Sequence, residues 1–199
     1  MGKVLASLLA CFAVPVMAQC ECDWRGPFSW LVEDADALLL GEVVAHSGNS
    51  MDIEVLRVMK GKEVRQRVRI WGERGDLCRA NVDDFAAGGQ WLFALQGIDA
   101  VPPGGFNPET PNVSYGRVGD YALSKCGAYW LRHEDGKLSG NITSVFRWDY
   151  EPAMNPVPVE LIQAFVDGEA DYADIIGESE EITSKEAWMR HMRERMDAP

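Results

Sequence analysis

The sequence predicts a mainly β protein, a closed barrel or sandwich of short strands followed by a helical C-terminal tail. Several short segments are continuously apolar or alternate between apolar and polar residues, as strands do. Gly-rich turns separate these segments, which is typical of small all-β domains. With 199 residues, of which 47% are hydrophobic and 25% charged, the chain is long enough for one substantial core.

The expected elements follow in order along the chain. A short helix is expected over 28–36, where Phe28, Leu31 and Val32 share one face and Ser29 is a candidate N-cap. Strands are expected over seven segments: 37–46, 52–59, 64–70, 90–95, 121–124, 128–133 and 138–142. Asp135-Gly136 is a hairpin signal between the last two strands. The Pro- and Gly-rich residues 97–119 are expected to form a long surface loop.

The C-terminal region is acidic and has helical periodicity. Residues 149–181 contain ten acidic and no basic side chains. A helix is expected to begin near Pro158 and to end at Gly168. The pattern from Thr183 to Glu186 is a capping box that would open a final helix. That helix would carry Trp188, Met192 and Met196 on one stripe, which we expect to dock on the core of the protein rather than on a partner or a membrane surface.

Composition excludes several classes of function. The chain has 19 Lys and Arg against 31 Asp and Glu, a net charge of −12, so a nucleic-acid partner is not expected. The three histidines, His46, His133 and His191, are far apart, and the sequence contains no metalloprotease, serine-hydrolase or nucleotide-binding motif. We therefore expect no enzymatic activity, no cofactor and no metal site.

The first 18 residues resemble an export signal. Lys3 precedes an apolar stretch that Pro15 interrupts, and Ala18 offers a small residue for cleavage. The mature protein is then expected to be secreted or periplasmic. A lipoprotein anchored through Cys11 and a buried N-terminal helix are the less favoured alternatives. No other segment is apolar enough for a membrane span, so a transmembrane protein is not expected.

Removal of residues 1–18 would leave four cysteines: Cys20, Cys22, Cys78 and Cys126. An even number in an exported chain indicates two disulfides. A Cys20–Cys22 bond would close a very tight ring. Two pairings therefore remain open: Cys20–Cys78 with Cys22–Cys126, or Cys20–Cys126 with Cys22–Cys78. A Cys-x-Cys thiol pair for metal or redox chemistry is the alternative interpretation.

Basic residues concentrate in the middle of the chain. Residues 57–79 contain eight Lys or Arg and three Asp or Glu. Within this region, Arg65, Arg67 and Arg69 are expected on one face of a strand. This face is a candidate binding site for an anionic ligand, such as a small anion or a polyanionic glycan. We favour a solvated outer face, and coverage by the acidic tail is a third possibility.

Four tryptophans, Trp71, Trp91, Trp130 and Trp148, fall in or next to predicted strands or directly before the tail. Such residues usually belong to the core, and lining of a ligand pocket is the alternative.

Seven motifs follow one another along the chain: C-E-C (20–22), A-D-A-L-L-L-G-E-V-V (35–44), V-M-K-G (58–61), V-R-I-W-G (68–72), Cys78, F-A-A-G-G-Q-W-L-F-A-L (85–95) and L-S-K-C-G (123–127). In their order and spacing, over about residues 20–132, the chain resembles the netrin-like domain, the module of the tissue inhibitors of metalloproteinases and of their bacterial relatives. The resemblance implies an OB-type five-stranded barrel with flanking helices over 19–148, followed by an extension over 149–199. It also implies the pairs Cys20–Cys78 and Cys22–Cys126.

The resemblance implies an exported binding or interaction module without catalytic activity, with a protein partner. In the animal inhibitors, the amine and carbonyl of the N-terminal cysteine bind the zinc of the protease, and the second residue enters its specificity pocket. The matching positions here are Cys20 and Glu21, followed by Cys22. Inhibition of a metalloprotease through this segment is therefore the alternative function, although Gln19 precedes Cys20 at the predicted mature N-terminus.

Overall fold

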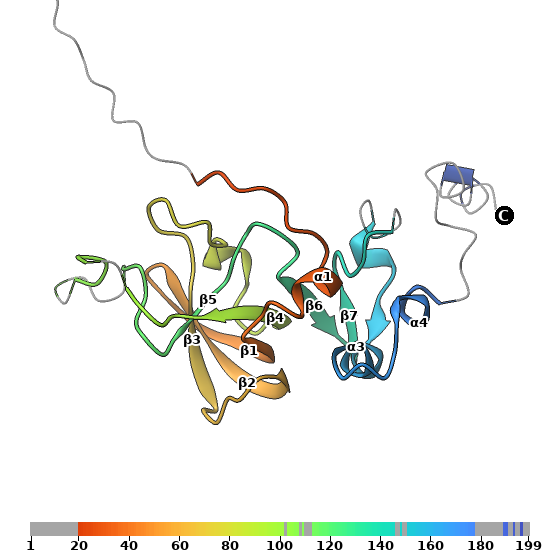
Figure 1. Ribbon diagram of the computed structural model, residues 1–199, viewed down its shortest axis with the longest axis horizontal. Helices are drawn as coiled ribbons and strands as arrows, with labels where there is room; N and C mark the ends of the chain where they lie inside the picture. Colours follow the sequence, from red (N-terminus) through yellow and green to blue (C-terminus); the bar gives the residue numbers. More distant parts are fainter. Residues whose placement is uncertain are drawn as a thin grey trace, which may run out of the picture.

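A computed structural model describes residues 20–101, 103–107, 109, 113–145, 148, 151–177, 189, 190, 193 and 196. The strands β1 to β5 form a barrel, and the helices α3 and α4 lie at the opposite end of the molecule, with α1 between them (Figure 1). The predicted export signal 1–18, including Cys11, lies outside the described residues, as do the capping box 183–186 and Trp188 and Met192 of the expected final helix. Met196 is described and is exposed.

The barrel is a closed sheet of five strands. Hydrogen bonds connect β1 to β2, β2 to β3, β3 to β5, β5 to β4, and β4 back to β1, so no edge remains open between them. These strands are β1 (Ala37–Ser47), β2 (Ser50–Lys60), β3 (Arg67–Trp71), β4 (Gln90–Gly97) and β5 (Tyr121–Ala122). The pairing of β3 with β5 is parallel and all the other barrel pairings are antiparallel. The predicted OB-type barrel is confirmed.

The central strand β1 explains why an uninterrupted apolar run appears in the sequence. Leu38, Leu39 and Leu40 are all buried, although neighbouring strand residues ordinarily point to opposite faces. The register between β1 and β2 shifts at these leucines, but the extra residues, Leu56 and Met59, lie on β2, and β1 pairs with β4 without interruption from Ala37 to Glu42. The leucines of β1 therefore alternate between its two faces. Consecutive leucines are buried because both faces of the strand are covered.

The segment V-M-K-G at the end of β2 anchors the first helix. Lys60 donates from Nζ to the carbonyl oxygens of Val32 and Glu33, at 2.7 Å each, beyond the C-terminal end of α1 (Phe28–Leu31). A cation at this end also complements the helix dipole. Gly61 has φ +88°, and a Cβ there would lie 2.5 Å from the carbonyl oxygen of Asp36. Only glycine at this position allows the end of β2 to pass so close to the backbone at the start of β1.

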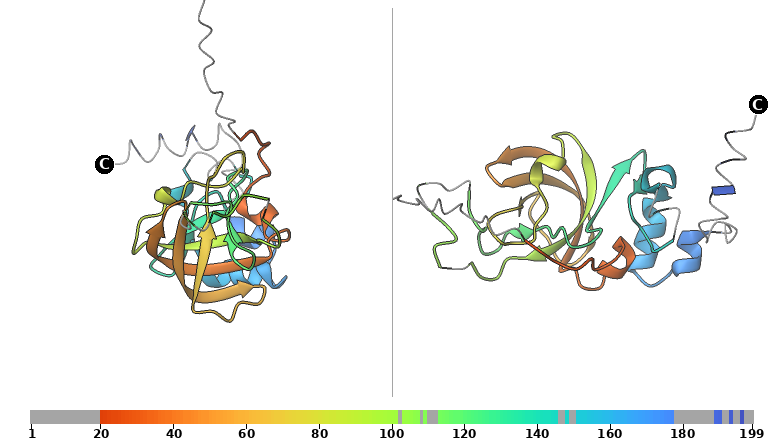
Figure 2. Two further views of the ribbon diagram at one scale, coloured as in Figure 1. Left: turned by 90° about the vertical axis from the view of Figure 1, so that its left-hand side faces the viewer. Right: turned by 90° about the horizontal axis from the view of Figure 1, so that it is seen from above.

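Beyond the barrel the sheet continues from β4 into β6 (Trp130–Glu134), β7 (Lys137–Ser139) and β8 (Val157–Pro158). The helix α3 (Val159–Val166) follows β8, and α4 (Tyr172–Ile176) follows α3. In Figure 2, these helices lie at the end of the described chain away from the barrel, on the side of β6 and β7. Trp148 is buried, and its Nε1 donates to the carbonyl oxygen of Asn155 at 2.9 Å. Within the described ranges, none of the helices has the length and apolar character that a bilayer crossing requires.

The structure corrects several expected boundaries. The helix α1 is one turn long, and Ser29 lies buried inside it without a capping bond, so the predicted N-cap is wrong. The strand expected over 64–70 begins only at Arg67, and the side chain of Val64 is 96% exposed. The strand expected over 138–142 ends at Ser139, because Gly140, at φ +152°, turns the chain toward Pro152. The helix α4 was not expected; Asp171 and Asp174 form its capping box.

Candidate functional site

The N-terminal segment is attached to the barrel through two disulfides. Cys20 is bonded to Cys78 and Cys22 to Cys126, with Cα–Cα distances of 5.2 and 5.8 Å. Both distances fall in the usual range for disulfides. Of the two pairings left open by the cysteine spacing, the structure has the one that the family resemblance implies.

The alternative interpretation of a metal-binding thiol pair is not supported. The Sγ atoms of Cys20, Cys22 and Cys78 lie within 4.8 Å of one another, which is close enough for a shared ion. A soft metal binds thiolates, however, and each of these sulfur atoms is part of a disulfide. The cluster is therefore a structural link between the N-terminal segment and two distant loops.

The backbone of the N-terminal segment is fixed while its side chains remain accessible. The amide of Arg25 donates to the carbonyl oxygen of Cys126 at 2.6 Å, and the amide of Ala128 donates to the carbonyl oxygen of Gly26 at 3.1 Å. Glu21 is exposed, as are the residues from Cys22 to Arg25, and the side chain of Trp24 is 61% exposed. Disulfides and backbone hydrogen bonds thus hold the segment against the barrel, while residues 21–25 remain exposed.

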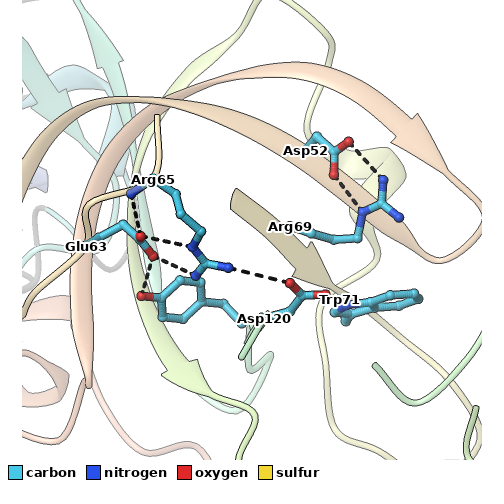
Figure 3. Close-up of polar contacts among 7 residues, drawn as sticks. Asp52, Glu63, Arg65, Arg69, Trp71 and Asp120 are labelled. Carbon is cyan, nitrogen blue, oxygen red and sulfur yellow. Dashed lines mark hydrogen bonds and ion pairs between the residues drawn. The ribbon is translucent and has the colours of Figure 1, made fainter. Parts of the chain in front are cut away.

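The first arginine of the predicted basic face is paired with a buried carboxylate. Arg65 donates to Glu63 through Nε at 3.0 Å and through Nη2 at 2.7 Å (Figure 3). The hydroxyl of Tyr121 donates to the same carboxylate at 2.9 Å. Asp120 lies 3.8 Å from Nη1 of Arg65 and accepts a bond from the indole Nε1 of Trp71 at 2.8 Å. This network connects the loop before β3 to β5.

The same contacts explain the titration of this cluster. The side-chain hydrogen bonds from Arg65 lower the pKa of Glu63 from 4.5 to about 2, although its side chain is only 4% exposed and burial acts in the opposite direction. The bond to Glu63 raises the pKa of Arg65, and burial, together with Glu63, raises the pKa of Tyr121. At neutral pH Glu63 and Arg65 form an ion pair, so Arg65 presents no unpaired positive charge to an anionic ligand.

The other two arginines differ from each other. Arg69 donates to Asp52 through Nε at 2.7 Å and through Nη2 at 2.9 Å, and these bonds raise the pKa of Arg69 (Figure 3). Arg67 is exposed and lies opposite Glu54 in the β2–β3 register. The three arginines thus do not present three free charges. Anion binding on this face, the less favoured interpretation, would therefore depend mainly on Arg67.

The acidic tail reaches the basic region at another position. Glu160 of α3 pairs with Arg57 of β2 at 3.1 Å, and Nε2 of Gln163 donates to the carbonyl oxygen of Met59 at 3.2 Å. These contacts dock α3 on the second half of β2. Among the described residues of the tail, none pairs with Arg65, Arg67 or Arg69.

Changing Arg65, Arg67 and Arg69 together to Gln tests the anion-binding hypothesis. We expect neither the wild type nor the triple variant to be retained on immobilised heparin at 0.1 M salt, where screening acts beyond about 10 Å. Retention of the wild type that weakens with salt and disappears in the variant would contradict this expectation and would identify an anion-binding face.

The tryptophans fall into two groups. Trp71 and Trp148 are buried in the core, as expected. Trp91 and Trp130 are only partly buried and line a surface recess together with Trp24. The sequence analysis did not single out Trp24, because it lies in an irregular segment with no periodicity. Its position two residues after the Cys-x-Cys motif is the one signal that could have drawn attention to it.

Comparison with known proteins adds no family or relative. No protein-family model matches the chain, and no curated protein matches it.

Proposed function

We propose that this protein is an exported binding module of the netrin-like type, without catalytic activity. One observation supports it above all: a closed five-stranded barrel carries an N-terminal Cys-x-Cys segment whose two disulfides lead to two separate loops. Stable disulfides of this kind form in oxidising compartments. The segment that they fix is exposed and would serve as the partner-binding surface.

Inhibition of a metalloprotease is the second candidate, and the exposure of Glu21 and Cys22 favours it. Zinc chelation would require that Cys20 carry a free amine at the N-terminus of the mature chain. Glu21 would also place a carboxylate in the specificity pocket of the protease, where removing it from water costs free energy unless a cation compensates for it. Binding without zinc chelation is therefore the preferred function.

The mass of the exported protein tests this proposal. We expect a chain that begins at Gln19, as glutamine or pyroglutamate, with no lipid and no reactive thiol. Non-reducing peptide mapping is expected to link Cys20 with Cys78 and Cys22 with Cys126. A chain that begins at Cys20 would favour the inhibitor, and a lipid on Cys11 would identify a membrane-anchored lipoprotein. Retention of residues 1–18 or stoichiometric thiols would contradict the exported module.

A further inference from the structure

Two recesses adjoin each other along β4 and β6. One, of about 310 Å³, is lined by Trp24, Trp91, Lys125, Gly127, Ala128, Trp130, Arg132, Ser139, Gly140, Asn141 and Pro152. The other, of about 520 Å³, is lined by Asp84, Ala86, Gly88, Gly89, Gln90, Trp91, Arg132, His133 and Glu134. Trp91 and Arg132 belong to both, and they lie opposite each other in the β4–β6 register. Together the recesses form one groove, which we call the β4–β6 groove.

The aromatic part of the β4–β6 groove has a rigid base. Phe85 is fully buried and packs edge-on against Trp91 and Trp130, with ring centroids 5.2 and 5.3 Å apart and interplanar angles of 83° and 82°. Trp91 and Trp130 are therefore held in place from below, while both remain partly exposed. Trp24, from the N-terminal segment, adds a third and largely exposed indole. Ring faces held in this way can contact an apolar surface without loss of side-chain freedom.

The polar side chains next to the indoles are Arg132 and Glu134. In the β4–β6 register Trp91 lies opposite Arg132, so these two side chains share one face of the sheet with Trp130 and Glu134, whereas Gln90 and His133 point to the other face. Arg132 lies 3.5 Å from Glu134, and its guanidinium has further N–H groups that can donate. A hydroxyl group both donates and accepts, so it matches this neighbouring donor and acceptor.

The charges of the groove balance. Lys125 and Arg132 supply two positive charges, and Asp84 and Glu134 supply two negative charges. Lys125 is further neutralised by Glu73, at 3.2 Å. A strongly charged ligand would gain little from the groove itself, and the net charge of −12 would repel a polyanion. The groove is complementary to a neutral ligand that has both apolar faces and many hydroxyl groups.

We infer that the β4–β6 groove binds a neutral oligosaccharide. The apolar ring faces of the sugars would lie on Trp24, Trp91 and Trp130, and their hydroxyl groups would bond with Arg132 and Glu134. From Trp130 to Glu134, β6 extends about 13 Å, which exceeds one sugar ring and favours a short chain of sugars. This inference deepens the proposed function and rests on it, because it names the ligand class of a binding module.

A titration with defined sugars tests the inference. The folded, disulfide-bonded protein is titrated with cellohexaose, chitohexaose and maltohexaose, and binding is followed by isothermal calorimetry and tryptophan fluorescence. We expect saturable binding of at least one of them, and a loss of affinity of about tenfold or more in the Trp24→Ala and Trp130→Ala variants. Trp24 is 61% exposed, so its replacement leaves the core intact.

Trp30→Ala is the matched control. Trp30 is 55% exposed but does not line the groove, so its replacement is expected to leave the affinity within about twofold. Arg132→Gln is expected to weaken binding with no change in the thermal midpoint beyond that of the control, because the pair of Arg132 with Glu134 is exposed.

The other outcomes would overturn the inference. These are no binding of any of the three sugars, equal loss in the Trp24 and Trp30 variants, or binding only of a heparin hexasaccharide or of a proline-rich peptide. The last result would identify a peptide groove instead. Each of these results leaves the proposed exported module standing, because the mass and the disulfide map test that proposal independently.

Discussion

Replacement of both Cys22 and Cys126 by alanine is expected to lower the free energy of unfolding by about 4.7 kcal/mol. The bond joins residues 104 positions apart. In the chain-entropy model, a cross-link that closes a loop of this length lowers the conformational entropy of the unfolded chain, and this stabilises the folded state by that free energy. The pair Cys20–Cys78 spans 58 positions, and its removal is expected to cost about 4.2 kcal/mol. Urea denaturation of the oxidised proteins measures both losses as a decrease in the midpoint.

The two double variants serve as controls for each other. Both remove a bond from the same N-terminal segment, so a difference between them of about 0.5 kcal/mol reports loop length. A loss below about 1 kcal/mol in both variants would mean that the unfolded chain is already ordered by other contacts. A much larger loss for Cys20–Cys78 than for Cys22–Cys126 would contradict the loop-length argument.

Replacement of Glu63 by Gln is expected to lower the free energy of unfolding at pH 7 by about 2 kcal/mol. The change keeps the shape of the side chain but removes the charge that Arg65 requires. The lowering of the Glu63 pKa in the folded protein, taken in full, would correspond to a larger loss of stability. The expected loss is smaller because the side chain of Arg65 is 42% exposed and water screens the pair. The matched control is Glu73→Gln, because Glu73 is 52% exposed in its pair with Lys125. That variant is expected to change the stability by less than about 0.5 kcal/mol.

The pH dependence of the same pair has a definite sign. The pKa of Glu63 is lowered to about 2 in the folded protein from an ordinary value of 4.5, so the folded state favours the ionised carboxylate. The stabilisation is present in full above about pH 4.5 and is lost as the pH falls toward about 2. The wild type and Glu63→Gln are therefore expected to approach equal stability over this range. A difference that stays constant down to pH 2 would show that packing, rather than charge, is responsible.

The sequence was informative wherever local chemistry decides structure. The alternation and the apolar runs located β1, β2, β4 and β6 to within a few residues, and Asp135-Gly136 marked the β6–β7 hairpin correctly. The helix expected between Pro158 and Gly168 is likewise present as α3, which spans Val159–Val166. Each of these signals depends on burial of one face or on a turn residue, and both leave a pattern in neighbouring positions.

The candidate site was predictable only in part. The disulfide pairing came from the family resemblance, since cysteine spacing left two pairings open. The arginines at positions 65, 67 and 69 were correctly identified as a concentration of charge, but their partners Glu63 and Asp52 were not. Ion pairs of this kind depend on which loop faces which strand, so they leave no period in the sequence. Trp24, which adds an indole to the β4–β6 groove, was missed for the same reason.

The sequence by itself thus determined that the chain is mainly β, where most of its strands lie along the chain, and that an even number of cysteines follows the predicted cleavage site. These properties follow from hydrophobic periodicity, turn chemistry and residue count, all of which are local. Only the tertiary structure decided that β3 pairs with β5 in parallel, that β1 closes the barrel against β4, and that two of the three arginines are already neutralised. It also brought Trp24 next to Trp91 and Trp130, which are far from it in the chain. Contacts between distant residues depend on the geometry of the closed sheet, and no local pattern encodes them.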